Sequence, residues 1–133
     1  MKHVLVDSGG WYALADRRDP DHRSAVSFLQ NNTQPLITTN FVFDETVTLI
    51  RIRMGWTVAA TFGRKLLQGG FVTLMSVRDE DEKRAWDIFL KFKDQDFSYT
   101  DCTSFAIMER LKMDAAFTFD RHFSVMGYRR LPA

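Results

Sequence analysis

The sequence is poor in cysteine and proline and carries almost no net charge. Its 133 residues include one cysteine, three prolines and seven glycines, and 18 basic side chains stand against 17 acidic ones. A single cysteine, Cys102, excludes an internal disulfide framework and fits a reducing cytosol. A net charge of +1 argues against a histone-like or polybasic membrane-binding protein, because both need a large field of one sign.

Long apolar runs and linkers are also missing. The first apolar run, Val4-Leu5-Val6, ends at Asp7 and is too short for a signal peptide, and no stretch approaches the length of a membrane span. The chain has no internal repeat, low-complexity tract or Pro/Gly/Ser linker. We therefore expect a single cytoplasmic domain over residues 1–133, which buries about two-thirds of its unfolded surface.

What the chain does contain is an alternation of short apolar runs and amphipathic segments. The runs show no polar–apolar alternation, which is typical of buried parallel strands. We expect strands at residues 2–6, 36–38, 71–75, 115–119 and 128–131, and helices at 21–30, 41–54, 58–67, 79–92 and 100–112. Strands alternating with helices predict an α/β fold, a three-layer α/β/α sandwich around a mostly parallel sheet of four to five strands.

Two aspartates follow the ends of predicted strands. Asp7 comes directly after Val4-Leu5-Val6, and Asp120 comes directly after Ala116-Phe117-Thr118-Phe119. Open parallel sheets bind ligands outside the carboxyl ends of their strands, so the two carboxylates would face the same crevice. The alternative is that each aspartate caps the helix that follows it.

Glu45 lies on a predicted apolar helix face. Its neighbours four and three residues before, and four and seven residues after, are Phe41, Val42, Leu49 and Ile52. A carboxylate on such a face is costly unless it is paired or binds a metal ion. The alternative here is an internal ion pair with an arginine.

Asp101 begins a predicted helix three residues after Ser98. That spacing fits a capping box, and aspartate is favoured at a helix N-terminus in any case. The helix nevertheless starts at the carboxyl edge of the predicted sheet, where Asp7 and Asp120 also fall. Asp101 is therefore a candidate for both roles.

Four carboxylates at one edge raise one another's pKa unless a cation lies among them. Mg²⁺ or Mn²⁺ suits such a site, because these ions take oxygen ligands from a few carboxylates, water and substrate phosphate. The chemistry that follows is metal-dependent hydrolysis of a phosphodiester.

The segments that carry these acids resemble a PIN domain. They are Val4-Leu5-Val6-Asp7-Ser8, Thr39-Asn40-Phe41-Val42-Phe43-Asp44-Glu45-Thr46, Ser98-Tyr99-Thr100-Asp101-Cys102 and Phe117-Thr118-Phe119-Asp120-Arg121-His122-Phe123. The order and spacing of these segments resemble those of PIN-domain motifs over essentially the whole chain. The most similar group is the VapC toxins of VapBC toxin–antitoxin modules. The resemblance implies a Mg²⁺- or Mn²⁺-dependent endoribonuclease that cleaves RNA, is silenced by an antitoxin and forms a homodimer.

The resemblance also assigns roles to residues. It implies Asp7 and Asp101 as direct metal ligands, Asp120 as a further ligand or one acting through water, and Glu45 as the group that orients or activates the attacking water. Ser8 and Thr100 would donate hydrogen bonds to these acids. The one departure from the family is Gly9-Gly10, which we expect to loosen the loop beside Asp7.

RNA and an antitoxin would need surfaces near this site. His122 is a candidate for phosphate contact or proton transfer, the alternative being a surface histidine in the loop after a strand. An apolar groove between the helices at 41–54, 58–67 and 79–92 would take the amphipathic helix of an antitoxin, whose terminal arginine would enter the acidic site. Candidate phosphate contacts are Arg17, Arg18, Arg23, Arg51, Arg53, Arg64, Lys65, Arg121, Arg129 and Arg130, and candidate base-stacking residues, if not buried in the core, are Trp11, Tyr12 and Phe43.

Two other functions remain open at this point. One is a PIN nuclease of RNA processing or quality control that works without an antitoxin. The other is a non-catalytic PIN module that binds RNA or protein. The presence of all four acids favours catalysis over the second of these.

Overall fold

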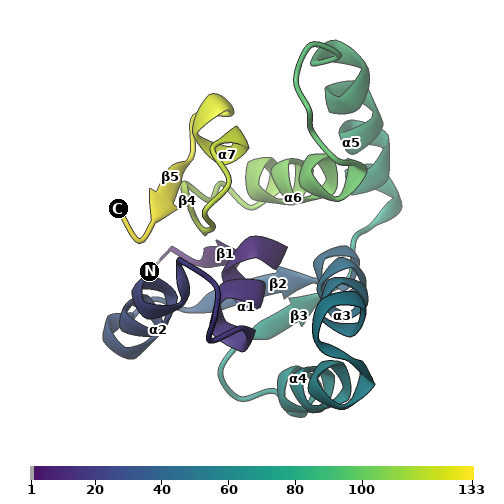
Figure 1. Ribbon diagram of the computed structural model, residues 1–133. Coiled ribbons are helices and arrows are strands. Elements are labelled where there is room, and N and C mark those ends of the chain that lie inside the picture. Colours follow the sequence, from purple (N-terminus) through teal and green to yellow (C-terminus); the bar gives the residue numbers. More distant parts are fainter. Residues whose placement is uncertain (1) are drawn as a thin grey trace.

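The computed structural model describes residues 2–133, which form five strands and seven helices (Figure 1). The strands are β1 (Val4–Val6), β2 (Leu36–Thr39), β3 (Thr73–Met75), β4 (Ala115–Phe117) and β5 (Arg129–Leu131). The helices are α1 (Ser8–Ala15), α2 (His22–Asn31), α3 (Asn40–Met54), α4 (Trp56–Gln68), α5 (Asp79–Lys91), α6 (Tyr99–Arg110) and α7 (His122–Val125). All five predicted strands and all five predicted helices are present, with ends that differ by a few residues.

The strands form one sheet in the order β3-β2-β1-β4-β5, and every neighbouring pair is parallel. β1 lies at the centre, between β2 and β4. Its last residue, Val6, is opposite Phe117, the last residue of β4. The chain segments that leave β1 and β4 therefore start at the same edge of the sheet and at the same level.

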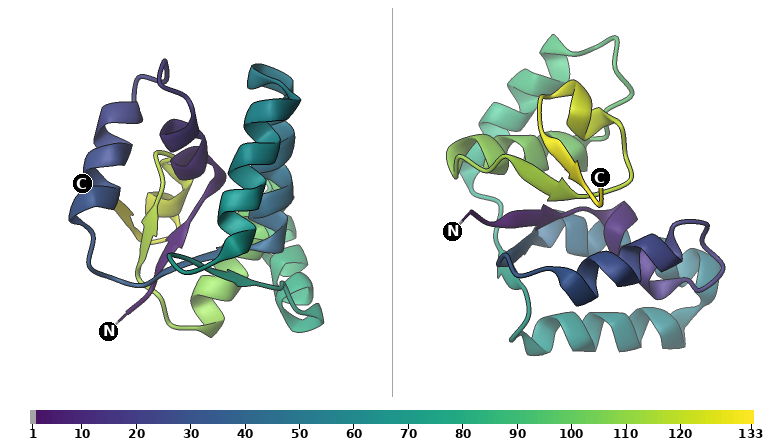
Figure 2. Two further views of the ribbon diagram at one scale, coloured as in Figure 1. Left: turned by 90° about the horizontal axis from the view of Figure 1, so that it is seen from below. Right: turned by 90° about the vertical axis from the view of Figure 1, so that its left-hand side faces the viewer.

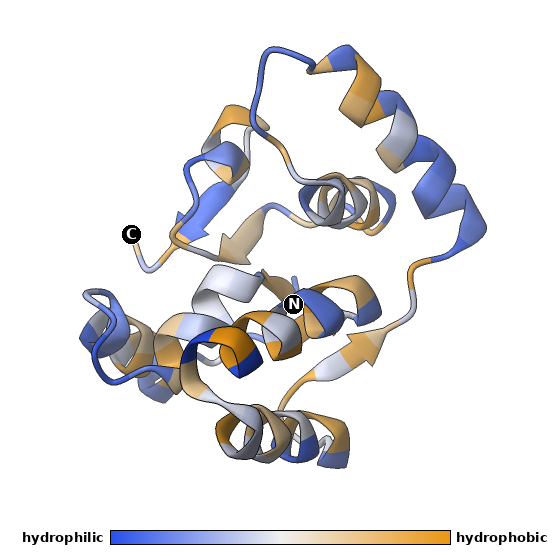
Figure 3. Ribbon diagram, turned by 45° about the vertical axis from the view of Figure 1, so that its right-hand side comes forward, coloured by the Kyte–Doolittle hydropathy of each residue, from blue (hydrophilic) through white to orange (hydrophobic). Residues whose placement is uncertain are grey.

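Helices cover both faces of this sheet, so the predicted three-layer sandwich is confirmed (Figure 2). Leu5 and Ala116 point into a core that α5, α6 and α7 cover. Val6 and Phe117, one residue further along their strands, point into the opposite core beneath α1 to α4. Both faces of β1 are therefore buried, which accounts for its unbroken apolar run. Hydrophilic residues gather at the outer, N-terminal end of α5 (Figure 3).

Helix α1 was not among the helices predicted from periodicity. It begins Ser8-Gly9-Gly10, which is a poor helix former, and it forms because the residues that follow, Trp11 to Ala13, are buried. Gly10 is also needed for packing, since a Cβ there would lie 2.7 Å from the backbone oxygen of Phe117. The expectation that Gly9-Gly10 loosens the loop beside Asp7 is therefore wrong: the pair belongs to a helix pressed against β4.

Three further expectations need correction. The face of α3 that enters the core carries Val42, Thr46 and Ile50, whereas Ile52 is 76% exposed. Strands β3 and β5 are edge strands, and two of the three residues in each are exposed. The segment after Asp120 is a short helix, α7, and not a loop. Within residues 2–133, no helix is both long enough and apolar enough to span a membrane.

Candidate active site

The ends of β1 and β4 place Asp7 beside Thr118. The Thr118 hydroxyl donates a hydrogen bond to Oδ2 of Asp7 over 3.0 Å, and its oxygen accepts one from the backbone N–H of Asp120, also over 3.0 Å. One threonine thus connects the two aspartates that follow neighbouring strands. The sequence patterns do not single out Thr118. The signal that points to it is the register of the sheet, which puts the residue after Phe117 level with Asp7.

The Asp7 carboxylate is buried and only half satisfied. Asp7 is 3% exposed, and its Oδ1 has no hydrogen-bond partner among residues 2–133. Although Asp7 occupies the N-cap position of α1, its side chain makes no capping bond, so the capping alternative does not explain it. Burial, followed by the charge of Asp101, raises the pKa of Asp7 to about 7.

Asp101 combines the two roles considered for it. Its backbone N–H donates to the Ser98 hydroxyl over 3.0 Å, and its Oδ2 accepts the Ser98 N–H over 3.2 Å, which completes a capping box at the start of α6. The residue is 6% exposed and faces the other acids. Burial and the charge of Asp120 raise the pKa of Asp101 to about 6. The capping box therefore fixes the carboxylate in place beside Asp120.

Glu45 is held by α1. The Ser8 hydroxyl donates to Oε1 of Glu45 over 2.6 Å, so the expected hydrogen bond from Ser8 is present. Glu45 lies at the margin of the buried face of α3 and is half-buried. Among residues 2–133 it forms no ion pair with an arginine, and that alternative is not realised.

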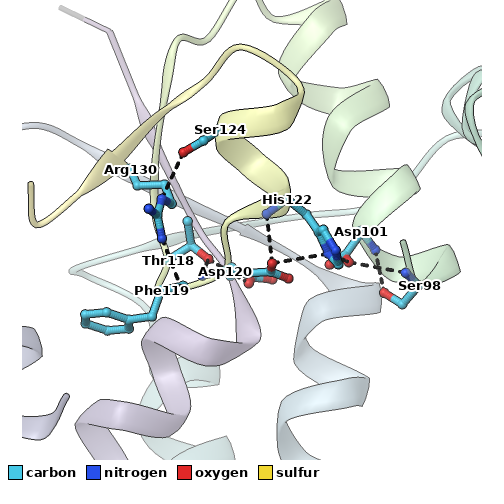
Figure 4. Close-up of polar contacts among 9 residues, drawn as sticks. Ser98, Asp101, Thr118, Phe119, Asp120, His122, Ser124 and Arg130 are labelled. Carbon is cyan, nitrogen blue, oxygen red and sulfur yellow. Dashed lines mark hydrogen bonds and ion pairs between the residues drawn. The ribbon is translucent and has the colours of Figure 1, made fainter. Parts of the chain in front are cut away.

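Asp120 and His122 complete the cluster (Figure 4). Oδ1 of Asp120 accepts the backbone N–H of His122 over 2.9 Å, and Nδ1 of His122 lies 3.2 Å from the same oxygen. One carboxylate oxygen each of Asp101 and Asp120 and one ring nitrogen of His122 all lie within 4.8 Å of one another. The histidine side chain is only 13% exposed, so the alternative of a surface histidine in a loop is wrong.

The neighbouring acids raise the pKa of the two most buried carboxyl groups of the site, Asp7 and Asp101. The charges of Asp101 and Glu45 raise the pKa of Asp7, and those of Asp120 and Glu45 raise the pKa of Asp101. No lysine or arginine neutralises Asp7 or Asp101 within residues 2–133. A buried carboxylate oxygen without a partner, in a group of like charges, is the environment that a divalent cation stabilises. The residues present therefore fit a bound metal ion.

The remaining predicted residues divide into buried and peripheral ones. Within residues 2–133, no hydrogen bond joins the Thr100 side chain to any of the four acids; only its backbone oxygen is engaged, by Thr103. Trp11 and Tyr12 are buried in the core and are not free to stack on bases. Phe43 is half-buried against α4, with its ring 3.5 Å from where a Cβ at position 63 would lie.

Two arginines, Arg121 and Arg130, lie close to Asp120. Arg121 directly follows Asp120 and is exposed. Arg130, on β5, donates to the Ser124 hydroxyl over 2.9 Å and to the Phe119 backbone oxygen over 3.3 Å, so its guanidinium lies beside the loop that carries Asp120 (Figure 4). Arg53 stacks over the Tyr12 ring at 5.0 Å.

Comparison with known proteins decides the family. The model of the PIN domain family matches residues 4–127. The chain belongs to the PIN-domain family. It is 30% identical over 125 residues to the 23S rRNA-specific endonuclease VapC20 of Mycobacterium tuberculosis, covering 94% of this chain and 95% of that protein. It is 27% identical to a VapC ribonuclease of Archaeoglobus fulgidus, covering 92% of this chain and 80% of that one.

The solved structures agree. The crystal structure of M. tuberculosis VapC20, described as a sarcin-ricin loop cleaving toxin, superposes with a TM-score of 0.90 at 28% identity and covers 94% of this chain and 95% of that one. A DNA-bound VapBC from Salmonella typhimurium shares the fold alone, with a TM-score of 0.71 at 9% identity over 98% of this chain and 97% of that one. The prediction of a VapC-type PIN endoribonuclease, a toxin class, is confirmed.

Proposed function

We propose that this PIN-domain protein hydrolyses RNA at the site formed by Asp7, Glu45, Asp101 and Asp120, with a divalent metal ion as cofactor. The observation that carries the proposal is the buried Oδ1 of Asp7, which has no partner among residues 2–133 and lies among like charges. A group in that position is stabilised by a cation and not by the protein. Mg²⁺ and Mn²⁺ are the candidates, because the donors are mainly carboxylate oxygens.

The side chains divide the work by their positions. Asp7, Asp101 and Asp120 would hold the ion, which supplies charge neutralisation at the phosphate and a lowered pKa for water. Glu45 is more open than Asp7 and is fixed by the Ser8 hydroxyl, which suits it to orient the attacking water and accept its proton. Thr118 fixes the position of Asp7 relative to Asp120 through the two hydrogen bonds of its hydroxyl.

The substrate class we propose is ribosomal RNA. The support is the similarity to VapC20, whose name specifies 23S rRNA and which is matched over 94% of this chain. Exposed cations beside the site, Arg121 and Arg130 among them, suit the phosphate backbone of a folded RNA loop.

An antitoxin is the proposed protein partner. Structural neighbours with this fold include VapBC complexes, whose names state both components. We expected the docking groove between α3, α4 and α5. The structure has an apolar groove of about 1,150 Å³ beside α1, α2 and α4, lined in part by Leu14, Leu29, Val58 and Phe62. That groove suits an amphipathic helix. The homodimer implied by the resemblance stays a prediction, which the molar mass in solution tests.

Removal of the metal tests the function. Purified protein incubated with ribosomal RNA and Mn²⁺ or Mg²⁺ should produce discrete fragments on a gel. Excess chelator should abolish them, because the acids alone repel both substrate and one another, and renewed Mn²⁺ should restore them. Cleavage that persists in chelator would contradict a metal-dependent mechanism.

A further inference from the structure

His122 faces two acids of the proposed site through a ring nitrogen. Its Nδ1 lies 3.2 Å from Oδ1 of Asp120 and 3.8 Å from Oδ2 of Asp101 (Figure 4). This nitrogen is buried, yet it has no hydrogen-bond partner among residues 2–133. The 3.2 Å distance is short enough for a hydrogen bond from Nδ1 to the Asp120 carboxylate. Because no such bond forms, the in-plane direction of Nδ1 does not point at that oxygen.

The surrounding structure holds the ring in this place. The backbone N–H of His122 donates to Asp120 Oδ1 over 2.9 Å, which ties the start of α7 to the acid. The ring of Phe97 packs edge-on against the imidazole, with 5.1 Å between centroids. The nearby Oδ1 of Asp7, nine-tenths buried or more and also unpartnered, independently marks this cluster as a place for a cation.

We propose that Nδ1 of His122 is a nitrogen ligand of the metal ion at Asp101 and Asp120, and that it makes the site prefer a divalent transition-metal ion to Mg²⁺. The inference rests on the metal-dependent function proposed above. The neutral imidazole, with its proton on Nε2, presents a lone pair at Nδ1. Transition-metal ions accept imidazole nitrogen, whereas Mg²⁺ takes oxygen ligands almost alone.

Mn²⁺ is the probe, because its electron spin-echo envelope modulation reports a directly bound nitrogen. The protein loaded with one equivalent of Mn²⁺ should show ¹⁴N modulation, which becomes ¹⁵N modulation when histidine is ¹⁵N-labelled. The modulation should be lost in His122→Asn and retained in His3→Asn. His3 is an exposed histidine before the N-terminal end of β1, whereas the site lies beyond its C-terminal end. By calorimetry, His122→Asn should weaken Mn²⁺ binding by roughly 10-fold or more and Mg²⁺ binding by less than about 2-fold.

Other results would overturn the proposal. Mn²⁺ that binds without nitrogen modulation, or equal losses of Mn²⁺ and Mg²⁺ affinity in His122→Asn, would make His122 a residue that only positions Asp120, and the proposed function would stand. Failure of the wild-type protein to bind Mn²⁺ at all would overturn the metal site itself. If His122→Asn does not fold, the labelled wild-type spectrum alone decides.

Discussion

Thr118 is the smallest part of the site whose role can be isolated, because its single hydroxyl serves two acids. Thr118→Val keeps the branched shape but removes the bond to Asp7 and leaves the Asp120 N–H without its acceptor. We expect RNA cleavage and Mn²⁺ affinity to fall roughly 10- to 100-fold and the unfolding free energy to fall by about 1–2 kcal/mol. Thr118→Ser, which keeps the hydroxyl, should retain most of the activity. Equal activity of the valine and serine variants would show that the bond is dispensable.

The raised pKa of Asp7 makes stability depend on pH in a definite direction. Asp7 titrates near 7 in the folded, metal-free protein and near 4 when unfolded, so between these values the folded state binds more protons. Its contribution to stability is complete below about pH 4 and is lost as the pH rises through about 7. In chelator, the melting temperature of the wild type should therefore fall between pH 5 and pH 8 relative to that of Asp7→Asn. Mn²⁺ should reverse this trend, because it binds the ionised carboxylates.

Thermal scans of both proteins across that range, with chelator and with Mn²⁺, provide the measurement. Groups away from the site titrate equally in the two proteins, so the difference between their curves reports Asp7 together with its electrostatic coupling to Asp101. Identical pH profiles would show that Asp7 ionises normally and would remove the electrostatic argument for a cation at this position.

Site residues that follow the end of a strand could be predicted from the sequence, because their place in the fold depends only on where the strand ends. Asp7 and Asp120 follow apolar runs, and the edge of a parallel sheet brings such residues together whatever the loops do. Thr118 was not predicted, and His122 was predicted only as a candidate for phosphate contact or proton transfer, not as a neighbour of Asp101 and Asp120. Their roles depend on the register of β1 with β4 and on the short turn into α7, neither of which leaves a periodic signal in the sequence.

Among the secondary-structure elements, α1 ties the site to the sheet through Gly10. A Cβ there would press on the Phe117 backbone oxygen at 2.7 Å, and the same oxygen accepts the Asp7 N–H over 3.1 Å. Gly10→Ala should therefore lower the unfolding free energy by about 1–3 kcal/mol and also reduce cleavage, because β4 and Asp7 must both shift.

Gly9→Ala is the matched control. Its Cβ would make only an ordinary contact, 3.9 Å from Asp7 Oδ2, so stability should stay the same or rise slightly with the better helix former. Chemical denaturation of the two variants measures the contrast. Equal stability of Gly10→Ala and Gly9→Ala would mean that α1 is free to move away from β4.

Two ion pairs join α5 to α6 and differ in burial. Arg110 binds both oxygens of Asp81 at 2.7 and 3.0 Å, and Asp81 is 2% exposed, whereas Arg84 and Glu109 are about half exposed. Arg110→Leu leaves a buried carboxylate without its partner and should lower the unfolding free energy by about 2–4 kcal/mol. Arg84→Leu, between the same helices, should cost less than about 1 kcal/mol. Urea unfolding of both variants measures the two losses of unfolding free energy. Equal losses would mean that Asp81 finds another partner in Arg110→Leu.

The limits of prediction at this scale are also physical. Five helices were found from their apolar periodicity, but α1 was missed because its burial, and not its composition, makes it a helix. For α3 the periodicity was read one position out of phase: the core takes Val42, Thr46 and Ile50, which places Glu45 at the margin where it meets Ser8. The buried position between Val42 and Ile50 is Thr46, a polar residue that apolar periodicity does not count as core. It can be buried because its hydroxyl donates a hydrogen bond to the Val42 backbone oxygen.

For the whole molecule, the near-zero net charge conceals an uneven distribution. Leaving out the four site acids, 18 basic side chains remain against 13 acidic ones, since 17 minus 4 is 13, so the rest of the chain has a balance of +5. A mildly basic molecule with an acidic site suits an enzyme that binds a polyanion and a divalent cation together. The composition rightly argues against a polybasic binder, and it is compatible with a metal-dependent ribonuclease.

The central claim is that the four acids form one metal-dependent RNA-cleaving site, and paired substitutions in one assay test it most directly. Asp101→Asn keeps the shape of the capping residue but removes a metal-facing charge, whereas Asp44→Asn changes the exposed acid beside Glu45. With ribosomal RNA and saturating Mn²⁺, Asp101→Asn should cleave at least roughly 100-fold more slowly than the wild type, and Asp44→Asn should match it within about 2-fold. Undiminished cleavage by a folded Asp101→Asn protein would contradict the account.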